Sequence, residues 1–331
     1  MFPLKKILVI QTAFIGDTIL ATAVLEHVRK HLPQVDVDVL VRKGNESLFA
    51  SHPFVAQTLV WDKKNAKYRN LLRLIRAIRK EQYDAVINLQ RHTASAIMTV
   101  LSGAKQTSGF DENFLSRFFT FRIKHRLGKK GETDYRHEVQ RCIELTKPWT
   151  PQEITLPKLY PSEEDVKFIE RYSQESFITI SPSSVWFTKQ TPIEVWQKLI
   201  GSVKQTIYLL GAPSDDALCH QLADRNSHVH VLAGKLTLLQ SAALMSKAHM
   251  NFTNDSAPLH LCSAVNAPVT AVFCSTLPEF GFGPLSQQAN VVQTREQLSC
   301  KPCGIHGRAS CPQGHFKCGA IEVNQLLQTI Q

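Results

Sequence analysis

The sequence predicts an α/β protein of two doubly wound domains, each a parallel sheet with helices on both faces. The chain has 331 residues, more than one domain of typical size contains. In both halves, strand-like apolar runs alternate with amphipathic stretches, which is typical of strand–helix–strand units. Four prolines between 148 and 161 interrupt the alternation and predict a linker. We therefore expect domains over 1–150 and 151–320, and a helix over 321–331 that could pack back on the first domain.

In the first half, an amphipathic segment joins the first two strand-like runs. Its residues Leu20, Val24 and Val28 are four apart, which puts them on one face of a helix. Pro33 ends this pattern. A second helix is predicted over 67–80, with leucines and isoleucines on one face and basic residues on the other. The predicted strands are 6–12, 35–41, 58–62 and 84–90.

The second half repeats the alternation with short turns. Open parallel sheets bind ligands outside the carboxyl ends of their strands, so we expect the strand-end loops of both domains to face each other across a cleft. The predicted strands are 177–183, 206–212, 229–234, 249–255 and 268–274, and the amphipathic stretches between them are about 192–201, 214–224, 237–247 and 256–264.

The composition argues against a membrane-spanning protein and indicates an anionic partner. Hydrophobic residues make up 43% of the chain, but no run reaches the ~18 apolar residues that a bilayer requires. Residues 1–150 hold 25 lysines and arginines against 14 acids, and the remainder 13 against 14. This excess favours an anionic partner for the first domain, although a solubilising surface would give the same count. Lysines precede the first apolar run, but no small-residue cleavage site follows. We interpret that run as the first strand of a cytoplasmic protein.

The stretch "FIGDT" places Asp17 at the first strand-to-helix turn, where dinucleotide-binding folds carry several glycines. An aspartate there can cap the helix. Thr18 is an equally good cap, which would leave the Asp17 carboxylate to act as a general base toward a hydroxyl. A carboxylate would also repel a phosphate bound on this helix, so we expect the nucleotide elsewhere.

The loop "ISPSSVWFTKQTP" over 180–192 is a candidate diphosphate site. It holds the hydroxyls of Ser183, Ser184 and Thr188 together with Lys189, just before a predicted helix. Small hydroxyls and one lysine beside a helix start can bind a diphosphate.

The stretch "TNDSAPLH" is the strongest local signal. Asp255 and Ser256 end a predicted strand and start a helix, with His260 one turn in. Such a helix start can bind an anion. The alternative is a well-capped helix that carries a surface histidine.

Four cysteines near the C-terminus, Cys300, Cys303, Cys311 and Cys318, have the spacing C-x2-C-x7-C-x6-C. In a reducing compartment, such thiols are more plausible as a structural zinc site than as two disulfides. A loop of free thiols is the other interpretation.

The acids Asp36 and Asp38 in "VDVDV" formally match a metal-binding D-x-D pair. Strict alternation predicts a half-exposed strand with both acids on the solvent side, so we expect no catalytic metal there.

Together these stretches resemble the ADP-heptose:lipopolysaccharide heptosyltransferases, glycosyltransferase family 9, and at several points their heptosyltransferase II branch. The resemblance covers nearly the whole chain, through "ILVIQTAFIGDTILATAVL", "YDAVINLQRH", "SSVWFTKQTPIEVW", "GAPSDD", "TNDSAPLHLCSAVNAPVTAVF" and "PEFGFGPLS". It implies the GT-B fold, in which two Rossmann-like domains face each other. It also implies inverting, metal-independent transfer of heptose from ADP-L-glycero-D-manno-heptose to the inner core of lipopolysaccharide.

The resemblance also implies roles for individual residues. Asp17 matches the family's catalytic base and Lys189 its donor-phosphate lysine, with Ser184 near the same diphosphate. Two departures from the family pattern lie in this region: Ala257 replaces a usual glycine, and Gln190 and Thr191 replace an Arg–Trp-like pair. The other donor-site matches are Asp215 or Asp216 for the ribose, Leu236 for the adenine, and Asp255, Ser256 and His260. The basic residues expected to bind the acceptor are Arg69, Arg73, Arg76, Arg91, His92, Arg122 and Lys124.

On this interpretation the protein requires no cofactor beyond its donor substrate, apart from the structural zinc considered above. Its partners are a nucleotide-sugar and a lipid-linked anionic glycan, with no nucleic acid. It would be a cytoplasmic monomer, peripheral to the inner face of the inner membrane. Two alternatives remain: a nucleotide-sugar 2-epimerase of similar fold, and a non-enzymatic anion-binding protein that uses its basic half.

Overall fold

The computed structural model describes residues 4–65, 67–224 and 226–330 and divides them into two compact units. The first unit comprises the chain up to Arg126 together with Glu138–Tyr160. The second comprises Leu127–His137 and the chain from Pro161 onward. The chain therefore passes between the units three times, where the sequence predicts a single linker.

Side chains of the first helix hold the proline-rich segment in the first unit. The ring nitrogens of His27 lie 2.9 Å from Thr155 Oγ1 and 3.1 Å from Thr150 Oγ1. The Tyr160 hydroxyl donates to Glu26 at 2.9 Å. Because these bonds attach the segment to the helix, the boundary lies after Tyr160, later than the position 150 that the prolines predict.

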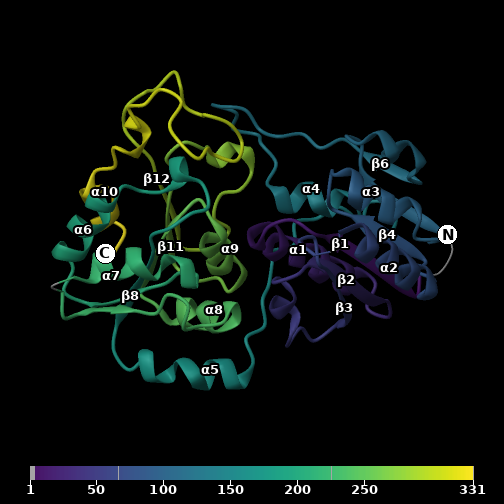
Figure 1. The fold of residues 1–331 in the computed structure, drawn as a ribbon, viewed down its shortest axis with the longest axis horizontal. Helices are drawn as coiled ribbons and strands as arrows, with labels where there is room; N and C mark the ends of the chain where they lie inside the picture. The colour runs from purple at the N-terminus through teal and green to yellow at the C-terminus, as the bar shows by residue number, and fades with distance from the viewer. Residues whose placement is uncertain (1–3, 66, 225, 331) are drawn as a thin grey trace. The chain divides into compact units, whose positions relative to one another are not determined.

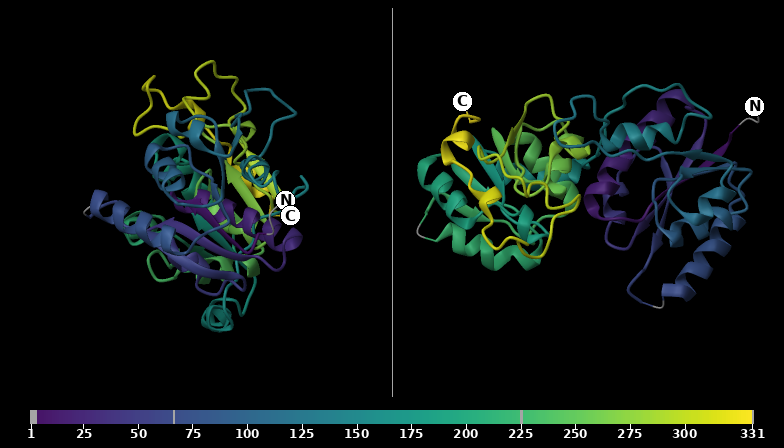
Figure 2. Two further views of the ribbon diagram at one scale, coloured as in Figure 1. Left: turned by 90° about the vertical axis from the view of Figure 1, so that its right-hand side faces the viewer. Right: turned by 90° about the horizontal axis from the view of Figure 1, so that it is seen from above.

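The first unit is built on one six-stranded parallel sheet of order β3-β2-β1-β4-β5-β6. Side chains of α2 and α3, among them Ile75 and Met98, pack with Leu8 and Leu40 on one face, and α1 covers the other face with α4 against it (Figures 1 and 2). The elements are β1 Lys6–Gln11, α1 Ile15–His31, β2 Asp36–Arg42, β3 Val55–Trp61, α2 Lys67–Lys80, β4 Ala85–Asn88, α3 Thr93–Val100, β5 Gln106–Phe110, β6 Phe121–Ile123 and α4 Glu138–Glu144.

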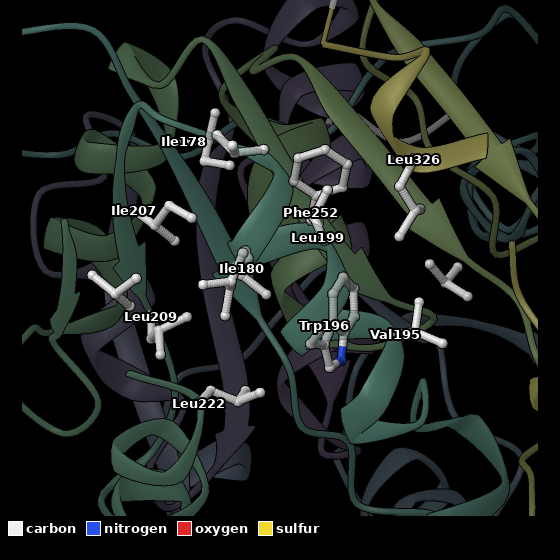
Figure 3. Close-up of a cluster of buried hydrophobic side chains, with 14 of the residues drawn as sticks. Ile178, Ile180, Val195, Trp196, Leu199, Ile207, Leu209, Leu222, Phe252 and Leu326 are labelled. Carbon is white, nitrogen blue, oxygen red and sulfur yellow. The ribbon is translucent and has the colours of Figure 1, made fainter. Parts of the chain in front are cut away.

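The second unit repeats this architecture with the strand order β12-β11-β10-β7-β8-β9. Figure 3 shows its core on one face, where Trp196 and Leu199 of α6 pack with Phe252 of β10 and Leu326 of α10. The elements are α5 Glu163–Ile169, β7 Phe177–Ser181, α6 Ile193–Ser202, β8 Thr206–Leu209, α7 Asp216–Ala223, β9 Val229–Val231, α8 Leu238–Lys247, β10 Met250–Asn254, α9 Ala257–Ala264, β11 Val269–Val272, β12 Ala289–Val292 and α10 Val323–Leu327.

The C-terminal helix α10 belongs to the second unit. Leu326 is fully buried in that unit's core, and the Thr270 hydroxyl donates to Thr329 Oγ1 at 2.7 Å. We therefore correct the expectation that residues 321–331 pack back on the first domain. α10 packs against α6 instead (Figure 1).

Asp38 is fully buried, which corrects the expectation that it faces solvent. Its Oδ2 accepts from the Tyr83 hydroxyl at 2.7 Å and lies 3.2 Å from Lys6 Nζ. The alternation misleads here because helices cover both faces of a parallel sheet, so β2 is buried on both faces over 37–41. Asp36, at the start of the strand, is exposed as predicted.

Candidate functional site

In both sheets, the strand order reverses beside the first strand of the unit. β1 lies between β2 and β4, and β7 lies between β8 and β10. In open α/β sheets, ligands bind outside the carboxyl ends of the strands at this position. Asp17 follows β1, Lys189 follows β7 and Asp255 follows β10. The fold therefore places the three main predicted site residues at the positions where such sheets bind ligands.

Asp17 lies in the first turn of α1 and is half-buried. The cap residue of this helix is Phe14, and no side chain caps it. The Thr18 hydroxyl donates instead to the Phe14 carbonyl at 3.1 Å and accepts from Asn45 at 2.7 Å. Neither Asp17 nor Thr18 is thus the helix cap that the sequence suggests. The helix dipole favours the charged form of a carboxylate at this position.

Side chains from two other strand ends fix the turn that precedes Asp17. Lys63 Nζ donates to the Thr12 carbonyl at 2.5 Å, and Asn45 Nδ2 donates to the Ala13 carbonyl at 3.2 Å. Lys63 follows β3 and Asn45 follows β2. Sequence reasoning missed both residues, although each lies just beyond a strand and therefore at the same edge of the sheet.

A buried charged cluster involves α4, the helix that packs against α1. The Glu138 carboxylate accepts from Arg141 at 2.7 Å and lies 3.0 Å from His125 Nε2. Burial alone would raise the pKa of Glu138, but these two partners outweigh it and lower the pKa to about 2. Burial also raises the pKa of the neighbouring Cys142 thiol, and the nearby negative charges of Glu138 and Asp17 add to this effect. α4 therefore supports the Asp17 end of α1.

Glu138→Gln should lower the free energy of unfolding by about 3–5 kcal/mol, because it removes the carboxylate of a buried ion pair. The folded-state pKa of about 2 lies below the ordinary value of 4.5. The carboxylate thus stabilises the fold above pH 4.5, and this contribution is lost as the pH falls toward 2. Urea titrations should show that the difference in free energy of unfolding between the wild type and Glu138→Gln shrinks over that pH range. The exposed Asp36→Asn serves as the control. If this difference stays constant between pH 7 and pH 2.5, the pairing of the Glu138 carboxylate with Arg141 and His125 is contradicted.

In the second unit, the largely buried Lys189 forms an ion pair with the buried Asp255. Lys189 Nζ lies 2.7 Å from Asp255 Oδ2, and their side chains are 14% and 6% exposed. The Thr276 hydroxyl, after β11, donates to the same oxygen at 2.6 Å. The pair therefore links loops that follow three adjacent strands. Thr276 was missed from the sequence, because its role depends on β11 lying next to β10.

The loop over 182–192 is held by Asn254, the last residue of β10. Its Nδ2 donates to the Pro182 carbonyl at 2.8 Å, and its Oδ1 accepts from the Thr191 amide at 2.9 Å. Both ends of the loop are thus attached to β10. Ser183 and Ser184, which we predicted to contact a diphosphate, lie inside this loop and are half-buried.

Thr188 is fully buried, and its hydroxyl binds within the protein. It accepts from the Arg308 amide at 2.8 Å and lies 2.9 Å from Ser275 Oγ. A side chain at Gly307 would collide with Lys189. Thr188 therefore holds the loop over 300–318 next to Lys189. The sequence did not indicate this structural role.

His260 is buried in α9, with 5% of its surface exposed. Burial lowers its pKa to about 3, although Asp255 opposes this effect. The ring is thus neutral near pH 7, and among the described residues its Nδ1 has no hydrogen-bond partner. This excludes the interpretation of His260 as a surface histidine. Ser256 is the cap residue of α9, and its side chain makes no cap hydrogen bond.

The other predicted donor residues follow β8 and β9. Asp215 Oδ2 accepts from the Ala212 amide at 2.8 Å, so this carboxylate shapes its own turn. Asp216 lies 3.6 Å from His220 at the start of α7. Leu236 is half-buried just before α8. All three are at the carboxyl side of the second sheet.

The basic residues predicted to bind the acceptor lie in three places in the first unit. Arg69 and Arg73 are exposed on α2 and, with Arg76, line a surface hollow. Arg91 and His92 follow β4, next to β1, and Arg91 pairs with Glu112 at 3.1 Å. On β6 and the segment after it, Arg122 and Lys124 are exposed. No helix in the described ranges is long and apolar enough to cross a membrane.

The four C-terminal cysteines lie near enough to act on one another's titration. Burial raises the pKa of Cys303, and Cys300 and Cys311 add to this effect. Burial likewise raises the pKa of Cys318, and the other three thiols add to it.

Cys300 Sγ lies 4.0 Å from His315 Nε2, whereas Cys318 is buried in the core of the unit. Over residues 4–65, 67–224 and 226–330, the one group of three or more ligand atoms within 4.8 Å of one another is His27, His31 and Glu153. The four thiols thus lie near one another, although among the described residues no three of their sulfur atoms come within 4.8 Å of one another. The structural zinc site stays a prediction.

The group of His27, His31 and Glu153 is a poor metal site. Both ring nitrogens of His27 are engaged by threonine hydroxyls. Glu153 already pairs with Lys30 at 2.5 Å and with His31 at 2.7 Å. A cation would have to displace these bonds next to a lysine charge, so the group serves to join the segment after α4 to α1.

Comparisons with known proteins match this chain to one protein family. The model of glycosyltransferase family 9 (heptosyltransferase) matches residues 71–309. The lipopolysaccharide core heptosyltransferase OpsX of Haemophilus influenzae is 24% identical over 330 residues, covering 91% of this chain and 87% of that protein. Lipopolysaccharide heptosyltransferase 2 of Escherichia coli is 24% identical over 325 residues, covering 87% and 88%.

Solved structures show the same fold. A glycosyl transferase family 9 protein from Veillonella parvula matches with a TM-score of 0.81 at 21% identity, covering 98% of this chain and 95% of that one. The E. coli ADP-heptose lps heptosyltransferase II matches with a TM-score of 0.75 at 20% identity, covering 98% of both chains. The predicted α/β fold class of two Rossmann-like domains is confirmed.

Proposed function

Because the chain belongs to glycosyltransferase family 9, the heptosyltransferases, we propose that this glycosyltransferase moves a heptose from ADP-L-glycero-D-manno-heptose to the inner core of lipopolysaccharide. The observation that carries the proposal is the largely buried Lys189–Asp255 pair at the carboxyl ends of β7 and β10. It places one fixed positive charge at the switch point of the second sheet. A solved structure of E. coli heptosyltransferase WaaC holds ADP-2-deoxy-2-fluoro heptose, which supports a donor of this class.

The second unit would bind the donor. Lys189 and the amide groups at the start of α9 offer positive charge to the diphosphate. Asp255 orients Lys189, and Ser183 and Ser184 lie in the adjoining loop. The same groups would stabilise the negative charge that develops on ADP as it leaves. They supply charge that a metal ion provides in other enzymes, so we propose a metal-independent reaction.

The first unit would bind the acceptor and supply the base. The Asp17 carboxylate accepts the proton of the acceptor hydroxyl. At the same time, the oxygen of that hydroxyl forms a bond to the anomeric carbon of the donor sugar. The bond from that carbon to the phosphate oxygen breaks in the same step, and its electron pair leaves with ADP. Attack opposite the leaving group inverts the anomeric centre. The exposed arginines of α2 and β6 suit the phosphates and carboxylates of a lipid-linked core at the inner face of the inner membrane, where we propose that a monomer acts.

The test is an assay of the purified protein with ADP-heptose and two acceptors, Kdo-lipid A with and without a first heptose. We expect one acceptor to gain a heptose by mass spectrometry, with ADP released in equal amount and no loss of rate in EDTA. An arm with donor alone detects an epimerase, since that enzyme would convert the donor without an acceptor. Turnover of neither acceptor, or conversion of the donor alone, would overturn the proposal.

A further inference from the structure

Residues 127–137, here called the strap, belong to the second unit although the chain on both sides belongs to the first. A side chain at Gly128 would collide with the Glu279 carbonyl, so the strap lies directly against that loop. Lys130 Nζ donates to the carbonyls of Leu298 and Lys301 at 3.1 and 3.0 Å. These contacts fix the strap on the second unit, beside the loop that follows β11.

The end of the strap reaches the donor motif. His137 Nε2 donates to the Gly283 carbonyl at 3.1 Å. Its ring also lies near enough to His260 for its charge to oppose protonation of that buried ring. His260 is one turn into α9, the helix that begins beside Asp255. His137 therefore stands next to the site built from Lys189 and Asp255.

Two buried polar atoms around the strap have no protein partner in the described part of the chain. They are His260 Nδ1 and Glu279 Oε2. Tyr135 lies beside Glu279: burial raises the pKa of its hydroxyl, and the Glu279 charge adds to this effect. Because buried polar groups in proteins normally have hydrogen-bond partners, these two atoms point to a polar ligand.

The side chains of Glu279 and His260 suit the hydroxyls of a sugar better than a phosphate. A carboxylate such as Glu279 accepts hydrogen bonds from hydroxyls and repels a phosphate. A neutral imidazole such as His260 carries one donor and one acceptor, which also suits a hydroxyl. The positive charge for a diphosphate is nearby at Lys189, so a glycosyl group attached to that diphosphate would extend toward these side chains.

We propose that the strap completes a sugar-hydroxyl subsite in the second unit, in which Tyr135, His137, Glu279 and His260 recognise the glycosyl part of the donor. This inference rests on the proposed function, because it assumes a nucleotide-sugar at Lys189. It assigns the strap a part in donor specificity. The residues involved come from 127–137, from α9 and from the segment after β11, more than 120 positions later in the sequence, which is why no single motif reveals the subsite.

The experiment is calorimetric binding of ADP and of ADP-heptose to the wild type, His137→Ala and Glu279→Gln. We expect both variants to bind ADP-heptose at least about tenfold more weakly, the loss of roughly one hydrogen bond to a buried group, while ADP affinity is unchanged. Glu279→Gln keeps the shape of the side chain, so it tests the subsite even if His137→Ala loosens the strap. Asp134→Asn, an exposed change in the strap, is the control and should bind both ligands normally.

The outcomes separate this inference from the proposed function. If the wild type binds neither ADP nor ADP-heptose, the proposed function fails. If the wild type binds both ligands and the two variants match it, or weaken ADP and ADP-heptose alike, the sugar subsite is wrong while the donor site stands.

Discussion

Asp17→Asn is expected to lower turnover by about 10²–10⁴-fold, the usual effect of removing a general base, while the affinity for ADP stays unchanged. Asparagine keeps the shape of the side chain in the first turn of α1 but cannot accept the proton of the acceptor hydroxyl. ADP affinity should be unaffected, because the donor phosphates are expected at Lys189 in the second unit. The measurement is steady-state kinetics with ADP-heptose and the preferred acceptor, beside calorimetry with ADP.

Asp36→Asn is the matched control, since Asp36 is an exposed aspartate of the same unit and its substitution should leave turnover at the wild-type value. A wild-type rate for Asp17→Asn would show that another group takes the proton. Equal loss of ADP affinity and turnover would indicate instead that the substitution disturbs the fold.

Lys189→Ala is expected to weaken ADP binding by about 10–100-fold, the range for hydrogen bonds to charged groups, and to lower turnover further. The substitution removes the positive charge and leaves the Asp255 carboxylate buried without its ion-pair partner. That carboxylate would then repel the incoming diphosphate. Turnover is expected to fall more than the affinity for ADP, because the positive charge of Lys189 also stabilises ADP as it leaves.

Lys198→Ala provides the comparison, because Lys198 is an exposed lysine on α6 of the same unit and should be dispensable. The double variant Lys189→Ala/Asp255→Asn should recover part of the ADP affinity, since it removes the repelling charge. Calorimetry with ADP measures all three proteins. Unchanged ADP affinity in Lys189→Ala would rule out the phosphate role of this lysine.

Regular periodicity made most of the fold predictable. The spacing of Leu20, Val24 and Val28 predicts a helix that the structure has as α1, and the apolar runs of the second half correspond to β7–β11. The prediction failed where a strand is short or polar. β5 is an example, because it contains Gly109 and its sequence shows no apolar alternation. The absence of a side chain at Gly109 leaves room for the Phe119 ring.

The candidate site was predictable where its residues follow strands in one stretch of sequence. Asp17, Lys189 and Asp255 were predicted in this way, and the structure places each of them just after a strand. The side chains that hold them in place were not predicted. Thr276 in the second unit, and Asn45 and Lys63 in the first, lie beside these residues only because of the strand order in their own sheet. The strap was missed for the same reason, since nothing local to 127–137 shows that it leaves the first unit.

The most direct test is a single-turnover measurement of ADP release from pre-bound ADP-heptose, with and without the acceptor. We predict that wild-type protein releases ADP quickly only after the acceptor is added, and that Asp17→Asn releases it at most one-hundredth as fast. Rapid release without any acceptor, or with equal speed from Asp17→Asn, would contradict transfer of the sugar to a hydroxyl deprotonated by this carboxylate.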